Sequence, residues 1–195
     1  MPKVVDHEQR REELAAAVWR LASRDGLDAV TIRNVAAEAG WSTGALHHYF
    51  SDKEELLLFA FGTVADRVGR RVATARESAT GPLELARSLL VMGLPLDAER
   101  RAETRVWFAF LGLALTRPPL ARAQRVAYRA WRELVADALR DAQEQGEIDA
   151  GLDVKREAAG LVALVDGLAV QASFEPRTLD VGLLDERLAR LGAAR

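Results

Sequence analysis

Residues 31–50 read TIRNVAAEAGWSTGALHHYF, and this stretch decides the fold of the chain. It contains two short segments with helical periodicity, separated by Ala39-Gly40-Trp41-Ser42. Thr31 and Ser42 are suited to cap helix N-termini, and Gly40 can end the first helix because glycine tolerates a left-handed backbone. Two short helices joined by a glycine-containing turn of three or four residues form a helix-turn-helix, whose second helix enters the major groove of DNA.

The second of these helices, expected at about 43–49, is poor in residues that form a core. Its small or polar members are Ser42, Thr43, Gly44, Ala45, His47 and His48, whereas Leu46, Tyr49 and Phe50 can pack inward. Small residues let a backbone approach DNA closely, and hydroxyl and imidazole groups can bond to bases or phosphates. A solvated helix in an ordinary bundle fits the same composition.

Working outward from this stretch, apolar residues recur with a period near 3.6, which predicts an all-α chain of about nine helices. The only β-like run is Val30-Thr31-Ile32. We expect a first helix at about 6–24 and a capping box in which Ser51 is the N-cap and Glu54 lies at N3. Later helices are expected to begin near Pro82, Asp97, Pro119, Asp153 and Leu179, and the last to end near Leu191.

Composition narrows the class of protein. The 195 residues are 49% hydrophobic and 29% charged, with a formal net charge of −2, as in a globular chain with room for two domains. The absence of cysteine excludes disulfides and thiolate metal sites. With only three histidines, a His-rich metal enzyme is not expected, and we predict no cofactor. Residues 1–60 hold seven basic and ten acidic side chains, so net charge there does not favour a polyanionic partner.

The sequence predicts no signal peptide and no membrane span. The charged N-terminus lacks the apolar region of a signal peptide. The longest uncharged run, Val106–Thr116, falls short of the about 20 apolar residues that span a bilayer. We therefore expect a soluble cytoplasmic protein that does not enter membranes.

Residues 27–56 resemble the DNA-binding domain of the TetR family. They carry its pattern of glycine, a hydrophobic residue, serine, a second glycine, leucine, phenylalanine, lysine and leucine, from Gly40 to Leu56. The resemblance implies that Thr31, Ser42 and Lys53 contact phosphates and that Tyr49 holds the DNA backbone or packs. It further implies that Arg33, Thr43, Gly44, Ala45 and His48 face bases. His47 stands where the family usually has a tyrosine that touches the DNA backbone.

The remainder of the chain is similar to the BetI-like branch of this family, at Arg105–Phe108, Pro118-Pro119 and Leu164–Leu168. A ligand pocket between helices is expected to involve Leu89, Met92, Glu103, Trp107, Phe110, Leu111, Tyr128, Trp131 and Asp166. Trp107 and Trp131 could stack on a flat or cationic ligand. Glu103 and Asp166 could balance a cation or serve a structural role, and any of the apolar residues could be ordinary core.

The segment 154–174 is apolar on nearly all sides, so it must be covered on nearly all sides. We expect it to pair with the last helix and their symmetry mates in a homodimer, through Ala163, Gly167, Val181, Leu184 and Leu188. Burial within one chain is the alternative. A two-fold dimer matches a palindromic operator with half-sites about 34–36 Å apart, or a multiple of that distance.

The sequence predicts a ligand-responsive DNA-binding regulator that binds a palindrome as a dimer and is released by a small molecule. The expected domains are 1–56 for DNA and 57–195 for ligand binding and dimerisation. A helical dimer that binds a small molecule but not DNA is the alternative. Gly40–Gly44 also matches the G-x-S-x-G motif of esterases, with Ser42 as nucleophile, but that motif requires a preceding strand, so an enzyme is not expected.

Overall fold

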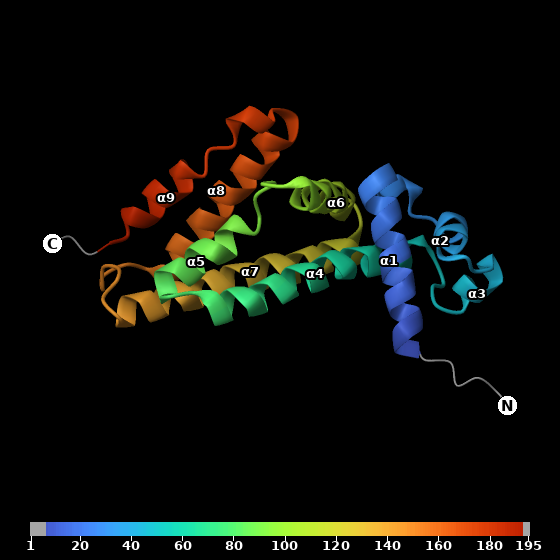
Figure 1. Cartoon of the computed structure of the whole chain (residues 1–195), viewed down its shortest axis with the longest axis horizontal. Helices are drawn as coiled ribbons and strands as arrows, with labels where there is room; N and C mark the ends of the chain where they lie inside the picture. Colours follow the sequence, from blue (N-terminus) through green and yellow to red (C-terminus); the bar gives the residue numbers. More distant parts are fainter. Residues whose placement is uncertain (1–6, 193–195) are drawn as a thin grey trace. The chain divides into compact units, whose positions relative to one another are not determined.

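The computed structural model describes residues 7–192. In this range it holds nine α-helices, two short 3₁₀ helices and no strand, which confirms the all-α prediction (Figure 1). The helices are α1 (His7–Asp25), α2 (Ile32–Ala39), α3 (Thr43–His47), α4 (Lys53–Ser78), α5 (Pro82–Val91), α6 (Ala98–Ala114), α7 (Pro118–Glu144), α8 (Val154–Phe174) and α9 (Gly182–Ala189). The 3₁₀ helices are η1 (Leu27–Ala29) and η2 (Pro176–Thr178).

The chain folds into two compact units. The first combines Met1–Arg67, as far as it is described, with Arg105–Gln124, and the second combines Val68–Thr104 with Arg125–Arg195, again as far as it is described. Three helices, α4, α6 and α7, each contribute to both units. The start of α4 therefore belongs to the same compact unit as the helices that precede it.

In the first unit, α1 packs on α2 and η1, and α2 packs on α3. Leu14, Ala17, Val18 and Leu21 form a buried apolar face of α1. Gly26 makes the turn after α1 with φ of 83°, a region that other residues rarely adopt. Burial of this face fixes α1 as the support for the two short helices.

The N-terminus of α4 differs from the expected capping box by one residue. Asp52, not Ser51, is the cap: its Oδ1 accepts a hydrogen bond from Glu55 N at 2.9 Å. The carboxylate of Glu55, not Glu54, reaches back to accept from Ser51 N at 2.7 Å. Aspartate and serine are about equally good caps, so the sequence left both registers open, and the box predicted at Ser51 and Glu54 was wrong.

In the second unit, α5, α8 and α9 pack against one another. Asp153 caps α8 as expected, because its Oδ1 accepts from Lys155 N and Arg156 N at 3.1 Å. An ion pair of 2.6 Å joins Arg87 of α5 to Asp185 of α9. These contacts hold the C-terminal helices to the body of the second unit.

By length and mean hydropathy of 1.3, α8 is the one described helix that could span a membrane. The sequence predicted this segment to be apolar on nearly all sides, but it predicted no membrane span. Core helices of soluble proteins pass the same test, and 39% of the apolar window of α8 is buried within the chain. This composition is weak evidence for a membrane span.

Candidate nucleic-acid interface and effector region

Both ends of the turn between α2 and α3 are fixed by local hydrogen bonds. Thr31 is extended, and its Oγ1 accepts from Asn34 N at 3.2 Å. Gly40 ends α2 with φ of 71° and ψ of 27°, in the left-handed region. Ser42 Oγ accepts from Ala45 N at 3.1 Å and caps α3. These are the caps and the glycine turn predicted from the sequence, and together they set the direction of α3.

The helix α3 presents its polar side to solvent. Leu46 is fully buried and Phe50 is buried just after the helix, so these two side chains anchor it to the first unit. Thr43, Gly44, His47 and His48 are exposed, as is the cap Ser42. A Cβ built on Gly44 would meet only Ser42 Oγ, at 3.9 Å, so nothing inside the fold requires glycine there.

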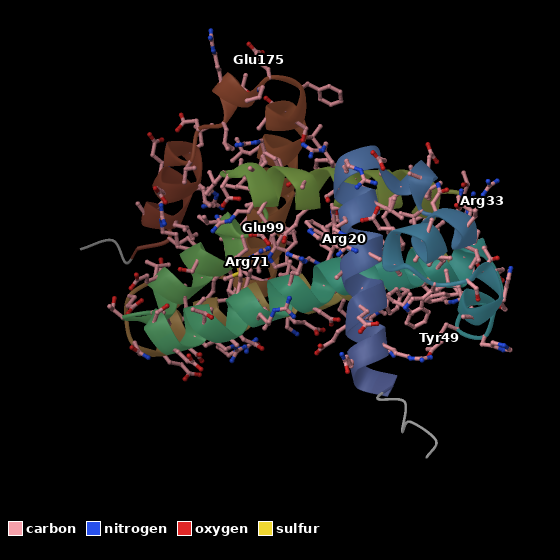
Figure 2. The ribbon with its side chains drawn as sticks, turned by 45° about the vertical axis from the view of Figure 1, so that its right-hand side comes forward. Arg20, Arg33, Tyr49, Arg71, Glu99 and Glu175 are labelled. Carbon is pink, nitrogen blue, oxygen red and sulfur yellow. The ribbon has the colours of Figure 1, made fainter. Side chains whose placement is uncertain are left out.

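Neighbouring residues frame this exposed face. Arg33 and Lys53 are exposed, and Thr31, Ala45 and Tyr49 are half-buried. Figure 2 shows Arg33 and Tyr49 at the α2–α3 end of the first unit. The rings of Tyr49 and Trp41 lie 5.5 Å apart, and the Arg10 guanidinium lies 5.2 Å from the centre of the Trp41 ring. Tyr49 is therefore held by packing, one of its two expected roles.

Ion pairs join acidic and basic side chains of this region in equal number, so its acidic excess is unchanged. Glu38 of α2 contacts Arg20 at 2.7 Å and Arg24 at 3.2 Å, and hydrogen bonds from these two arginines lower its pKa. Arg24 also pairs with Asp25 at 2.9 Å. No acidic residue lies on α3 itself. Because α3 carries no acidic residue, the net charge of residues 1–60 does not describe the charge of its exposed face.

The aromatic residues expected in the ligand pocket fall partly in the first unit. The Phe61 ring of α4 stacks on Trp107 at 5.3 Å and on Phe110 at 4.0 Å. Phe110 is buried, and Trp107 and Leu111 are half-buried. Sequence analysis missed Phe61, because its spacing on α4 looks like that of any core residue.

Glu103 lies in the second unit, where its charge is already balanced. Its carboxylate accepts hydrogen bonds from both terminal nitrogens of Arg71, one of them at 2.9 Å (Figure 2 labels Arg71). Glu103 is buried, and a bidentate pair of this kind leaves the carboxylate little capacity for a cationic ligand. The geometry favours the structural role for Glu103.

The remaining residues expected to bind ligand lie in the second unit, where Trp131 contacts Leu89 and packs over Gly93. Trp131 Nε1 donates to the carbonyl oxygen of the buried Leu89 at 3.3 Å. A Cβ on Gly93 would lie 2.7 Å from the Trp131 ring and 2.8 Å from Val165 Cγ1, so only glycine fits beneath this indole. Met92, next to Gly93, is half-buried.

Asp166 of α8 accepts a hydrogen bond from the Tyr128 hydroxyl of α7. Burial raises the pKa of Asp166, while the Tyr128 bond and the nearby Arg132 partly oppose this shift. The Arg132 guanidinium also lies 6.0 Å from the centre of the Tyr128 ring. An aromatic hydroxyl beside a partly desolvated carboxylate is chemistry suited to a small cation.

Replacing Asp166 by asparagine should stabilise the chain at pH 7.5 more than at pH 4. Because burial raises the pKa of Asp166, the folded chain binds this proton more readily than the unfolded chain. As the pH rises through the folded-state pKa of Asp166, ionisation of its buried carboxyl lowers the free energy of unfolding. The asparagine variant cannot ionise and does not lose this stability. Thermal unfolding at the two pH values measures the difference, and an equal gain at both would contradict the burial argument.

The residues expected at a dimer interface divide between surface and interior. Leu184 and Leu188 of α9 are buried in the chain's own second unit, so their side chains offer no surface to a partner. Ala163 is exposed, and Gly167 and Val181 are half-buried. Sequence analysis missed the exposed apolar side chains Val170, Phe174 (88% exposed) and Leu183. The steps of 4, 3 and 4 from Ala163 to Phe174 could have revealed one face of α8.

The geometry of Ser42 does not support the esterase alternative. Its Oγ is occupied as a helix cap, and the residue lies between two helices. The strand that a nucleophile elbow requires is absent from residues 7–192.

Two family descriptions match the chain. Residues 14–59 match the tetR family of bacterial regulatory proteins. Residues 82–193 match the C-terminal part of BetI-type transcriptional repressors. The first match contains α2, the turn and α3, and the second contains α5 to α9.

Related proteins match this chain in sequence along nearly its whole length. The transcriptional regulator PksA of Bacillus subtilis is 37% identical over 90% of this chain and 84% of that protein. A BetI regulator of Escherichia coli is 30% identical over 92% of this chain and 90% of that protein. A regulator from Rhodococcus, 32% identical over 93% and 92% of the two chains, has a TM-score of 0.74.

A transcriptional regulator from Saccharomonospora viridis, solved in complex with choline, is 26% identical and gives a TM-score of 0.80 over 94% and 95% of the two chains. Family matches, relatives and structures thus agree with the helix-turn-helix built by α2 and α3. The chain belongs to the TetR family, in its BetI-like branch, and is a ligand-responsive DNA-binding transcriptional regulator.

Proposed function

We propose that the protein is a homodimeric repressor that binds a palindromic operator and is released by a small molecule. The observation that carries this proposal is α3, a capped helix whose polar side faces solvent while Leu46 anchors its other side. In this proposal Thr43, Gly44, Ala45, His48 and Arg33 face bases. Thr31, Ser42, His47 and Lys53 contact the backbone, and Tyr49 packs on Trp41 beside them. Residues 1–56 are the DNA-binding domain, residues 57–195 bind ligand and dimerise, and the protein acts in the cytoplasm, where its DNA is.

The dimer in this proposal uses the exposed face of α8. Ala163, Gly167, Val170 and Phe174 follow one another along this face, and Leu183 of α9 adds another exposed apolar side chain. Small residues allow two copies of the helix to approach closely, and exposed apolar side chains gain free energy when covered. A two-fold pair would present two copies of α3 to the two half-sites of a palindrome.

The effector in this proposal includes a small cationic group held in the second unit. Tyr128, Trp131 and Asp166 supply two aromatic rings and one carboxylate that no formed ion pair neutralises. The choline bound by the Saccharomonospora viridis relative supports a quaternary ammonium compound as the first to test. The ligand must bind the DNA-free state more tightly, with a coupling of about 1–3 kcal/mol.

Replacing Gly44 by alanine tests the proposed function directly. The new methyl group meets only Ser42 Oγ at 3.9 Å, so the fold should be kept. If α3 lies in the major groove, the methyl group should disturb base contacts worth about 1–3 kcal/mol and weaken operator binding at least about tenfold. Footprinting on the DNA beside the protein's own gene identifies the operator, and titration with both proteins gives the ratio.

The same titration distinguishes the proposed repressor from the alternative, a dimer that binds a small molecule but not DNA. A helical dimer that only binds a small molecule should protect no palindrome at any protein concentration. Wild-type affinity in the Gly44→Ala variant would instead show that α3 does not approach the bases. Alanine at Gly112, which is also exposed and has no neighbour within 4 Å of its Cβ position, is the matched control.

A further inference from the structure

Gln124, on the second turn of α7, is a buried amide without a hydrogen-bond partner. Its side chain lies in the interior, with the residue only 5% exposed, and neither Nε2 nor Oε1 bonds to any residue that the structure describes. A buried polar group in this condition costs free energy that a partner would recover. The condition therefore points to a binding partner from outside the chain.

A second glutamine on the same helix shows how a structural amide behaves. Gln143 Nε2 donates to the carbonyl oxygens of Asp149 and Leu152 at 2.9 and 3.2 Å, and so ties the end of α7 to the following loop. Gln124 has no comparable role. A leucine or methionine would fill its place in the core without an orphaned amide.

The described interior of the first unit, which ends at Gln124, holds no charged side chain. The other buried polar side chain of this unit is Thr63, whose hydroxyl already donates to the carbonyl oxygen of Ala60 at 2.7 Å. None of the charged residues described in this unit is buried. Within this unit an ionised ligand group would find no buried counter-charge, which favours a neutral partner.

The same unit holds a cluster of aromatic rings. The Phe61 ring stacks on Trp107 and on Phe110, and Trp107 is half-buried. Phe110 and Gln124 each lie seven residues from Arg117 in the connection between α6 and α7, on opposite sides of it. Phe110 is therefore about one helical turn from this connection and Gln124 about two.

We infer that Gln124 recognises a neutral carboxamide or lactam on an otherwise flat, apolar effector. A primary amide has two donors and one acceptor, and a ligand group with an adjacent donor and acceptor pairs with it through two hydrogen bonds. This inference rests on the proposed function, because it names the chemistry of an effector. Gln124 belongs to the first unit, whereas Tyr128, one helical turn further along α7, and Asp166 belong to the second.

The probes are 2-naphthamide and its methyl ketone analogue 2-acetylnaphthalene, which differ only in the donor. Direct binding to the purified full-length protein, without DNA, is measured by quenching of tryptophan fluorescence. The wild-type protein should bind the amide at least about tenfold more tightly than the ketone, the ratio expected for one good hydrogen bond. In the Gln124→Leu variant the two probes should bind equally.

The melting temperature distinguishes an amide without a partner from an amide with a structural role, because replacement by leucine should raise it in the first case and lower it in the second. The Gln124→Leu variant should melt above the wild-type protein because it no longer buries an orphaned amide. The control Gln143→Leu should melt below it because two hydrogen bonds to the loop are lost. A lower melting temperature for Gln124→Leu would overturn the inference, since it would reveal a partner within the protein.

Three other outcomes overturn the inference: no amide binding at millimolar concentration, equal binding of the two probes by wild-type protein, or an amide preference that survives in Gln124→Leu. Equal binding of the two probes by the wild-type protein, together with a raised melting temperature of Gln124→Leu, would assign the partner to a buried water molecule. Operator binding is measured on the same preparations. A wild-type protein that binds the operator but shows no amide preference contradicts only this inference, whereas absent operator binding contradicts the proposed function.

Discussion

Operator affinity should fall at least about a thousandfold when Arg33 and Thr43 are both replaced by alanine. Both side chains are exposed, Arg33 on α2 and Thr43 at the first position of α3. Each base contact is worth about 1–3 kcal/mol, and a symmetric dimer makes each contact twice, so the loss is at least about 4 kcal/mol. Fluorescence anisotropy with the footprinted operator, at one fixed salt concentration, measures the effect.

The control for this double variant is Arg76→Ala, which removes an exposed arginine in the second unit. It should leave operator affinity within about threefold, because one screened surface charge contributes little. Neither variant disturbs a buried side chain, so melting temperatures should match that of the wild-type protein. Wild-type affinity in the Arg33→Ala, Thr43→Ala protein would remove these residues from the DNA interface.

Replacing Gly167 by arginine should convert the dimer to a monomer at micromolar concentration. Gly167 lies between Ala163 and Val170 on the exposed face of α8, and a Cβ there meets nothing within 4 Å of its own chain. The side chain therefore fits the monomer, but two arginines would meet across a two-fold helix pair and be desolvated there. Analytical ultracentrifugation measures the change in mass.

Operator affinity should fall with the dimer, because a single α3 reads only half of a palindrome. The matched control is Gly69→Arg on α4, where the glycine is exposed and, like Gly167, is helical with open space around its Cβ position. That variant should stay dimeric and bind the operator. A Gly167→Arg protein that remains dimeric would place the interface on another surface.

Much of the fold was predictable from local signals. The caps at Thr31, Ser42 and Asp153, the left-handed Gly40 and the inward position of Leu46 were each expected and are each present. These features depend on hydrogen bonds and side-chain spacing within three or four residues, which a single sequence displays in full. The α4 cap was misplaced by one residue because adjacent Ser51 and Asp52 compete for the same role.

The candidate ligand region was less predictable. Glu103 and Asp166 looked alike as acids on apolar helices, yet Arg71, 32 residues away in the sequence, pairs with Glu103, while Asp166 receives only the hydroxyl of Tyr128. The importance of Phe61 and Gln124 was equally hidden, since core spacing alone does not reveal which ring stacks or which amide lacks a partner.

The sequence by itself determined an all-helical chain with a capped, solvent-facing α3, because caps and periodicity act over one or two helical turns. Only the tertiary structure decided which side of the apolar helices α8 and α9 is covered by the chain itself. Leu184 and Leu188 went to the interior, and Val170 and Phe174 stayed at the surface. That division depends on packing against α5, a distant segment, and a helix apolar on all sides carries no local mark of which side its neighbours will cover.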